Sequence, residues 1–301
     1  MKPKLGFIGL GNIGGPMCRS LLENGYEVSI YDANSEAVSR LDDTLAESAQ
    51  NLKALASSAE VVILSLPDSD VVEEVVLGEG GLAEELSSGK VLIDTSSSKS
   101  SSTREIAKRL AESGVEMLDA PVSGGVLRAE EGKLAVMVGG RKEVFERCRE
   151  VLEAFGEKIF HVGDHGAGHL VKSLNNLLSA TTLASAAEAV ILAEKAGVAP
   201  ETLLEVINAG NGRSYSTEVK FPNFILDRSF DDGFALGLMV KDLKIALETA
   251  TEMGHPMFSG SSISQLWQAA SVRGYGPEGH TSIYAFLENL SGEDPKREIG
   301  G

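Results

Sequence analysis

Hydrophobic and polar residues follow two different patterns along the chain. Up to about residue 163, short runs of β-branched and other apolar residues alternate with segments whose apolar residues recur every three or four positions. The runs predict strands and the intervening segments predict helices, as in an α/β domain with a parallel sheet. Beyond residue 163, every periodic segment has helical spacing. The pattern predicts an N-terminal α/β domain, residues 1–163, and an all-α C-terminal domain, residues 164–301.

The boundaries of these elements can be placed from the same pattern. The apolar runs of the first domain predict strands at residues 5–10, 27–31, 61–66, 91–94, 116–120, 134–138 and 159–162. A helix is predicted at residues 141–155. Beyond residue 198, helical spacing predicts helices at residues 200–209, 217–226, 237–253, 259–273 and 282–290.

The pattern over residues 166–197, at the start of the second domain, predicts one long helix that begins with glycines. Lys172 and Asn176 in its first turns are four residues apart, so both side chains lie on one face. The helix macrodipole opposes a positive charge near the helix start, and partial burial lowers a lysine pKa further. A lysine in this setting can donate and accept a proton near neutral pH. The alternative, a solvated surface lysine beside a helical asparagine, is the commoner case when the helix is considered alone.

A glycine-rich turn follows the first strand. The order strand, G-x-G-x-x-G, helix and second strand is the fingerprint of a Rossmann dinucleotide-binding domain. Gly9 provides the tight turn, Gly11 lets a pyrophosphate approach the helix N-terminus, and Gly14 permits close packing of helix on strand. Asn12 and Ile13 lie in the same turn and are predicted to contact the cofactor.

The second predicted strand ends at Asp32. Its carboxylate is placed to accept hydrogen bonds from the adenosine ribose hydroxyls and would repel a 2′-phosphate, so NAD is favoured over NADP. Neither Ala33 nor Asn34 offers a compensating positive charge. The alternative is an ordinary turn residue, which the upstream fingerprint makes the weaker interpretation.

Two further loops follow strand C-termini, where open α/β sheets bind ligands. Leu66 and Pro67 follow one strand, and the serine-rich run at residues 96–102 follows the next. We expect cofactor contacts at the start of this run and a helix cap at its end, at Thr103. The alternative is a flexible connection that only caps the helix at Thr103.

A third glycine-rich stretch contains Ser123, Gly124 and Gly125. A hydroxyl and unencumbered backbone N–H groups can form a concavity suited to a carboxylate. An ordinary glycine turn explains the spacing equally well. His161, His165 and His169 recur every four residues, but glycines at 163, 166 and 168 interrupt a regular helix there and no H-E-x-x-H pattern is present, so no metal site is predicted.

Composition narrows the range of partners. The 301 residues include 44 acidic and 27 basic side chains, a net charge of -17, which disfavours nucleic acid as a partner. The two cysteines, Cys18 and Cys148, have no metal or redox spacing, which fits the cytoplasm. Neither a signal peptide nor an uncharged stretch of membrane-spanning length is predicted, so we expect a soluble protein with no membrane partner.

Four segments in one order, GFIGLGNIGGPM, DAPVSGG, GAGHLVKSLNN and VKDLKIA, resemble the β-hydroxyacid dehydrogenase family. The resemblance covers about residues 4–290, and it is specific for the family but not for the substrate. It implies a Rossmann domain joined by a long helix to an all-α domain. It also implies NAD(P)-dependent, reversible oxidation of a small 3-hydroxy acid of the 3-hydroxyisobutyrate type to its semialdehyde.

The same resemblance assigns roles to individual residues. It makes Lys172 the general acid and base, Asn176 its substrate-binding neighbour, and residues 123–125 the loop for the substrate carboxylate. Lys241 would close over the cofactor from the second domain, and Leu66 and Pro67 would lie on the nicotinamide side. Ser97, to which the resemblance assigns a cofactor contact, stands where relatives commonly carry threonine.

Alternative functions remain. The substrate could be another small semialdehyde or a 2-(hydroxymethyl)glutarate-type acid. A non-catalytic dinucleotide-binding relative or an imine reductase is disfavoured, because such relatives lack the lysine. The middle of the long helix, residues 179–193, is rich in small residues and poor in charge. Such a surface is typical of subunit contacts and predicts a homo-oligomer, a dimer or tetramer.

Overall fold

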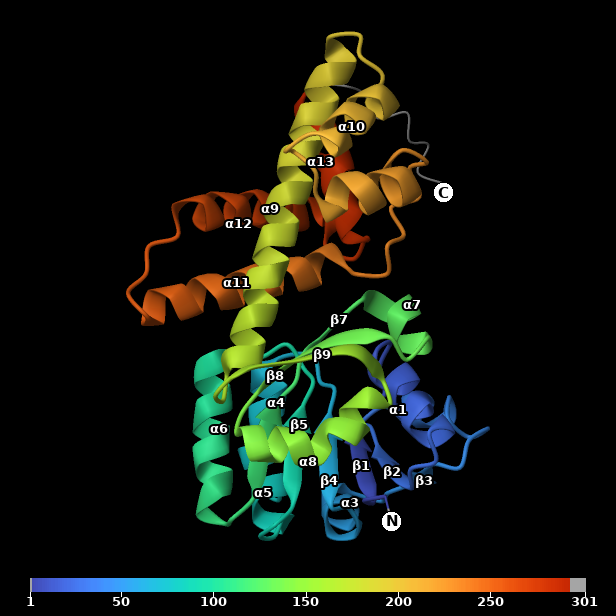
Figure 1. Ribbon diagram of the computed structural model, residues 1–301, viewed down its shortest axis with the longest axis vertical. Coiled ribbons are helices and arrows are strands. Elements are labelled where there is room, and N and C mark those ends of the chain that lie inside the picture. The colour runs from blue at the N-terminus through green and yellow to red at the C-terminus, as the bar shows by residue number, and fades with distance from the viewer. Residues whose placement is uncertain (1, 293–301) are drawn as a thin grey trace. The chain divides into compact units, whose positions relative to one another are not determined.

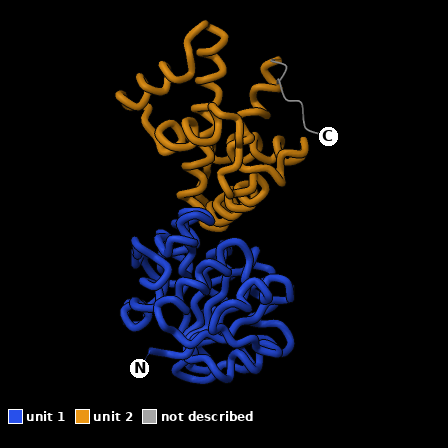
Figure 2. The backbone as a smooth tube through the Cα atoms, turned by 90° about the vertical axis from the view of Figure 1, so that its right-hand side faces the viewer, with its two compact units in different colours: residues 1–172 blue, residues 173–301 orange. Residues whose placement is uncertain are grey.

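The computed structural model describes residues 2–292. The chain forms two compact units, residues 1–172 and residues 173–301 (Figure 2). The division falls within the long helix α9 (Ala167–Lys195), which therefore begins in the first unit and continues in the second. The boundary predicted between residues 163 and 164 lies just before this helix.

The first unit is built on a single sheet with the strand order β3-β2-β1-β4-β5-β6-β8-β7, and β9 pairs with β8. Neighbours from β3 to β6 run parallel, whereas β8 is antiparallel to β6 and β7. The strands are β1 (Leu5–Ile8), β2 (Val28–Tyr31), β3 (Glu47–Ser48), β4 (Val61–Leu64), β5 (Val91–Asp94), β6 (Glu116–Asp119), β7 (Val122–Ser123), β8 (Leu134–Gly139) and β9 (Gly156–Gly163). The seven predicted strands are confirmed, with ends that differ by up to three residues.

The central strands are apolar on both faces because both faces of the sheet are covered. In β4, Ile63 packs in one hydrophobic cluster while its neighbours Val62 and Leu64 pack in another. Ile93 and Leu92 in β5 divide in the same way. Continuous apolar runs of this kind are typical of parallel strands buried between two layers of helices.

Helices surround this sheet (Figure 1). They are α1 (Gly14–Glu23), α2 (Ser35–Ser39), α3 (Leu52–Ser58), α4 (Ser69–Leu77), α5 (Leu82–Glu85), α6 (Ser100–Glu112), α7 (Gly125–Glu130) and α8 (Lys142–Glu153). The prediction of one plain connection between residues 120 and 134 missed both β7 and α7.

The predicted helix cap at Thr103 is wrong. Helix α6 begins three residues earlier, at Ser100, with Lys99 as its N-cap residue. Thr103 Oγ1 lies 3.1 Å from the Lys99 carbonyl oxygen, one turn earlier, a placement typical of threonine inside a helix.

The second unit is helical, as predicted. Besides most of α9 it contains α10 (Pro200–Ala209), α11 (Leu236–Glu252), α12 (Phe258–Ala270) and α13 (Ile283–Leu290). The helix predicted at residues 217–226 is present at Ser216–Ile225, but as a π-helix with i to i+5 hydrogen bonds and with Pro222 inside it. The helix predicted at residues 259–273 changes to the same wide form at Ser271–Tyr275, where Gly274 has φ +99°.

Helix α9 is long and apolar enough, by length and composition, to cross a membrane. The sequence expectation concerned uncharged stretches, and Lys172 and Glu188 interrupt this helix with charge. Half of its most apolar 18-residue window, 50%, is buried within the protein. Buried core helices meet the same criterion, so length and composition alone do not indicate a membrane span.

Candidate functional site

The glycine turn between β1 and α1 has the geometry that the fingerprint predicts. Gly9 has φ +93°, and a Cβ there would lie 2.2 Å from the Ser65 carbonyl oxygen. A Cβ on Gly14 would lie 2.0 Å from the Gly9 carbonyl oxygen. Fold geometry therefore requires glycine at both positions.

Gly11 differs from these two glycines. A Cβ at Gly11 would meet no protein atom within 4 Å, and Gly11 and Asn12 are both exposed at the start of α1. The protein itself does not require glycine here, whereas close approach of a pyrophosphate to the backbone does. Residues 9–14 therefore fit a dinucleotide, whose phosphates the N-terminus of α1 would face.

Asp32 follows β2 and lies beside the glycine turn. Its Oδ2 accepts a hydrogen bond from Leu10 N at 2.7 Å, and its Oδ1 accepts one from Asn34 N at 2.7 Å. The carboxylate is half-buried, and these bonds fix its orientation next to the phosphate turn. Each oxygen keeps a second lone pair with which it can accept from a ribose hydroxyl.

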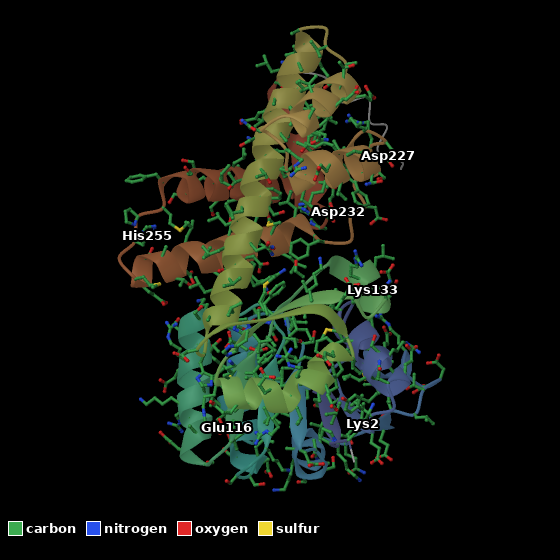
Figure 3. The ribbon with its side chains drawn as sticks, viewed as in Figure 1. Lys2, Glu116, Lys133, Asp227, Asp232 and His255 are labelled. Carbon is green, nitrogen blue, oxygen red and sulfur yellow. The ribbon has the colours of Figure 1, made fainter. Side chains whose placement is uncertain are left out.

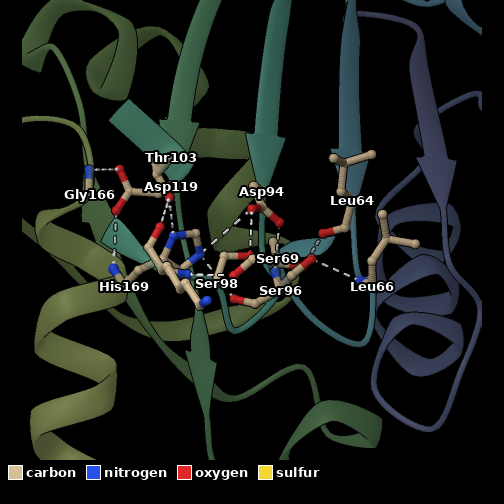
Figure 4. A network of polar contacts seen from close by, with 12 residues as sticks. Leu64, Leu66, Ser69, Asp94, Ser96, Ser98, Thr103, Asp119, Gly166 and His169 are labelled. Carbon is tan, nitrogen blue, oxygen red and sulfur yellow. Dashed lines mark hydrogen bonds and ion pairs between the residues drawn. The ribbon is translucent and has the colours of Figure 1, made fainter. Parts of the chain in front are cut away.

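The loops after β4 and β5 are tied together by side-chain hydrogen bonds (Figure 4). Ser96 Oγ accepts from Leu66 N at 2.9 Å, and Thr95 Oγ1 donates to the Leu64 carbonyl oxygen at 2.6 Å. Ser69 Oγ accepts from Lys99 N at 2.8 Å. These bonds place residues 66–67 and residues 95–98 side by side at the carboxyl ends of neighbouring parallel strands.

The glycine stretch after β6 contains more structure than predicted. Ser123 ends β7 and pairs with Ala135 of β8, and α7 begins at Gly125. Gly124 has φ +139° and Gly125 has φ +72°, so the chain reverses sharply between strand and helix. The carboxylate-binding role of Ser123, Gly124 and Gly125 stays a prediction.

The first turn of α9 is held by a buried carboxylate. Asp119, at the end of β6, accepts hydrogen bonds from Gly166 N at 2.8 Å and from His169 N at 3.1 Å. It thereby satisfies backbone donors that the start of a helix leaves unpaired, and its charge complements the helix dipole. A Cβ on Gly168 would lie 2.3 Å from the Met137 carbonyl oxygen, so this turn packs directly on strand backbone.

Lys172 lies one turn further along α9, and the residue is 8% exposed. Burial of an ammonium group is costly and is a common property of functional lysines. Asn176, four residues on and on the same face, is 6% exposed. The predicted surface alternative for Lys172 is therefore wrong, because neither side chain is solvated.

Sequence reasoning missed Asp242 in α11. Asn176 Nδ2 donates to Asp242 Oδ2 at 2.5 Å, and Asp242 is 2% exposed. This bond fixes which way the Asn176 amide faces. Lys241 Nζ lies 3.6 Å from the other Asp242 oxygen, which has no hydrogen-bond donor within residues 2–292. The family resemblance had indicated Lys241 in the VKDL segment. Asp242 is the next residue of that segment, and this adjacency is the signal that could have identified it.

The three spaced histidines have separate partners. His161 Nε2 lies 2.7 Å from the Gly140 carbonyl oxygen, and His165 Nε2 lies 3.1 Å from the Met117 carbonyl oxygen. His169 contacts Thr103 and Ser96 instead. Each ring is thus held by a different part of the first unit.

Comparison with known proteins identifies the class. Residues 4–163 match the model of the NAD-binding domain of 6-phosphogluconate dehydrogenase. Residues 166–287 match the model described as NAD-binding of NADP-dependent 3-hydroxyisobutyrate dehydrogenase. Together with the glycine turn and the buried Lys172, these matches define an NAD(P)-dependent oxidoreductase.

Individual relatives agree over nearly the whole chain. The 2-(hydroxymethyl)glutarate dehydrogenase of Eubacterium barkeri is 40% identical over 289 residues, 96% of each chain. Human mitochondrial 3-hydroxyisobutyrate dehydrogenase is 33% identical, covering 95% of this chain and 87% of its own length. The structure of Mycobacterium tuberculosis 3-hydroxyisobutyrate dehydrogenase with L-serine has a TM-score of 0.90 at 30% identity, covering 95% of this chain and 99% of that one. The chain belongs to the β-hydroxyacid dehydrogenase family.

Proposed function

We propose that the protein reversibly oxidises a small 3-hydroxy acid, of the 3-hydroxyisobutyrate type, to its semialdehyde, with Lys172 as the general acid and base. The observation that carries this proposal is the buried Lys172 one helical turn from a buried Asn176. The Asn176 amide is in turn oriented by Asp242. The dinucleotide that we expect at the glycine turn, residues 9–14, would supply the hydride acceptor.

The roles of these residues follow from proton balance. When bound, the nicotinamide would accept a hydride from the hydroxyl-bearing carbon in oxidation and return it to the same carbon in reduction. In oxidation, Lys172 Nζ takes the proton from the substrate hydroxyl, and in reduction it returns a proton to the forming alkoxide. Asn176 orients the hydroxyl, and residues 123–125 hold the carboxylate, so that the reacting carbon is fixed.

A second substrate class has specific support. The relative from Eubacterium barkeri, with 40% identity, is named for 2-(hydroxymethyl)glutarate, which carries a second carboxylate. A non-catalytic dinucleotide-binding role is the less favoured alternative, because both Lys172 and Asn176 are retained and buried.

A substrate panel tests the proposal. Purified protein would be assayed by NADH absorbance with 3-hydroxyisobutyrate, 2-(hydroxymethyl)glutarate, glycerate and 3-hydroxypropionate, each at saturating NAD. Turnover of 3-hydroxyisobutyrate with the highest kcat/KM is the expected result. Highest kcat/KM with the dicarboxylic acid would replace the substrate class. NADH binding without turnover of any of these acids would favour the non-catalytic role.

For the cofactor we propose NAD rather than NADP, on the basis of Asp32. Its carboxylate is fixed beside the glycine turn by Leu10 N and Asn34 N, where a 2′-phosphate would meet a negative charge. The comparison of kcat/KM for NAD and NADP in the wild-type protein decides the matter. A preference for NADP would show that Asp32 does not perform this selection.

We also propose a homo-oligomer, dimer or tetramer, built through the second unit. Leu178 and Leu192 of α9 are 66% and 68% exposed, and exposed Ser185 and Ala189 lie between them on the same side. An apolar face of this kind is more typical of a subunit contact than of solvent. Light scattering should give a mass well above the 31.7 kDa of one chain. A mass of one chain at micromolar concentration would contradict the proposal.

A cytoplasmic location is proposed as well. Cys18 and Cys148 are both free and buried, as is usual for proteins of reducing compartments. Fractionation of cells that express the tagged protein would test this, and recovery with membranes or outside the cell would contradict it.

A further inference from the structure

His169 lies in the first turn of α9, three residues before Lys172, and its imidazole is buried, with 1% of the residue exposed. Its Nδ1 lies 2.7 Å from Thr103 Oγ1 of α6. Its Nε2 lies 3.1 Å from the Ser96 carbonyl oxygen and 3.8 Å from Asp94 Oδ2 (Figure 4). One ring thus connects α9 with two segments that lie about seventy residues earlier in the chain.

The segment that His169 contacts is the loop after β5, which contains the predicted cofactor residue Ser97. Asp94 fixes this loop, because its Oδ1 accepts from Ser96 N at 3.0 Å and its Oδ2 accepts from Ser98 Oγ at 3.3 Å. Ser96 Oγ in turn accepts from Leu66 N in the neighbouring loop. The imidazole therefore contacts a loop whose backbone is already held by other bonds.

The hydrogen-bond partners also fix which nitrogen of the His169 ring carries a hydrogen. The partner of Nε2 is a carbonyl oxygen, which can only accept, so Nε2 carries a hydrogen. Three residues along a helix separate neighbours on one face, so His169 and Lys172 project from the same side of α9. Any rotation of this turn would move the Lys172 side chain and break the bond to the loop at the same time.

An apolar residue would fill the same buried volume at less cost in desolvation. The hydrogen bonds from both ring nitrogens to separate segments are what a merely space-filling side chain would not supply. Alignment of the reacting groups is demanding, because a misplacement of about 1 Å can reduce the rate on the order of a hundredfold.

We propose that His169 is a positioning residue, which holds the loop at residues 95–98 and the turn of α9 that carries Lys172 in one register. The hydride-transferring cofactor and the proton-transferring lysine are thereby aligned together. This inference rests on the proposed function of Lys172.

The test compares His169→Leu with His169→Gln, using the acid that the wild-type protein turns over best. His169→Leu should lower kcat by about ten- to a hundredfold. The KM for the acid and the NADH affinity should change by less than about threefold, because the groups that bind these ligands remain. His169→Gln should recover much of kcat, since its amide can donate to the Ser96 carbonyl and accept from Thr103.

Two controls separate positioning from stability. Val151→Ala removes buried methyl groups in α8 of the same unit. If it lowers the free energy of unfolding as much as His169→Leu does, it should still keep wild-type kcat. Thr103→Val removes the Nδ1 partner, and its effect on kcat should not add to that of His169→Leu, because both changes break one contact.

The outcomes are distinct. Wild-type kcat in His169→Leu, or an equal loss of kcat in Val151→Ala, would overturn the positioning role while the proposed function stands. A failure of His169→Gln to recover activity above that of His169→Leu would overturn it as well. An absence of wild-type turnover on every acid would overturn the proposed function, and this role with it.

Discussion

Each unit buries aspartate beside histidine, but the two clusters are stabilised differently. In the first unit, Asp119 accepts from two backbone N–H groups at the start of α9. In the second, Asp232 (Figure 3) lies 2.7 Å from His280 Nδ1, and His280 Nε2 lies 2.7 Å from Lys220 Nζ. Lys220 also donates to Ser179 Oγ of α9 at 2.8 Å.

The partners of Asp119 are backbone N–H groups, whereas the second cluster joins three ionisable side chains. Burial lowers the pKa of Lys220 to about 8, although Asp232 opposes the shift. Burial also lowers the pKa of His280, and its bond to Asp232 offsets part of this effect. For Asp232, burial alone would raise the pKa, but the hydrogen bonds from His280 and Thr281 outweigh it and lower the pKa. We therefore expect the contribution of the second cluster to the free energy of unfolding to depend on pH.

The two buried lysines give the largest expected contrast. Lys172→Ala should reduce kcat by about a hundred- to ten-thousandfold, the usual contribution of general acid and base catalysis. NADH binding, followed by fluorescence, should be nearly unchanged, because the predicted cofactor contacts lie mainly in the glycine turn and the strand-end loops.

Lys195→Ala, an exposed lysine in the last turn of the same helix, is the matched control and should keep wild-type kcat. Lys220→Met should also keep kcat within a few-fold, since no predicted ligand contact involves it. If Lys172→Ala retained more than about a tenth of wild-type kcat, it would not be the general acid and base.

Removal of the Asp119 carboxylate should mainly lower the free energy of unfolding. Asp119→Ala leaves two buried N–H groups at the start of α9 without their acceptor, and should lower the free energy of unfolding by about 2–5 kcal/mol. Asp119→Asn keeps one acceptor oxygen and should lose less. Urea denaturation at pH 7 provides the measurement.

The exposed Asp164, near the same helix end, supplies the comparison. Asp164→Ala should change the free energy of unfolding by less than about 0.5 kcal/mol, as is usual for surface positions. Equal losses in the two variants would mean that general electrostatics at the helix end, rather than the buried bonds of Asp119, stabilise α9.

The extent of successful prediction follows from what sequence patterns report. Apolar runs located the strands because both sheet faces are buried, and the glycine turn was predictable because its spacing is local. Lys172 and Asn176 were found by helical spacing for the same reason. The bond between Asn176 and Asp242 joins residues 66 positions apart, and no periodicity indicates such a pair.

The errors have two different causes. The serine run at residues 96–102 was predicted to end in a cap at Thr103, but its side chains bond to distant partners: Ser96 Oγ to Leu66 N and Ser100 Oγ to the Gly166 carbonyl. The wide helical turn around Pro222 has apolar spacing close to that of an ordinary helix. Tertiary contacts decided the structure of the serine run, whereas Pro222 is a local signal against a regular α-helix that the apolar spacing does not register.

The last and smallest expected effect tests the pH dependence of the second cluster. The ammonium of Lys220 loses its proton near pH 8 in the folded protein, but only near the usual lysine value of 10.5 when unfolded. Between these values the unfolded state binds more protons, so the contribution of Lys220 to stability becomes more favourable as pH rises. Below about pH 8 the cost of burying the charge is fully present. Relative to Lys220→Met, the wild-type protein should gain at most about 3 kcal/mol between pH 8 and pH 10.5.

The measurement is urea denaturation of both proteins at several pH values from 7.5 to about 10.5, analysed as the difference between their free energies of unfolding. The difference cancels groups common to both, such as Cys148, whose pKa burial raises to about 11. Lys244→Met, which removes a lysine side chain that is 73% exposed, is the matched surface variant for this comparison. A flat curve for Lys220→Met would show that Lys220 keeps its proton when buried.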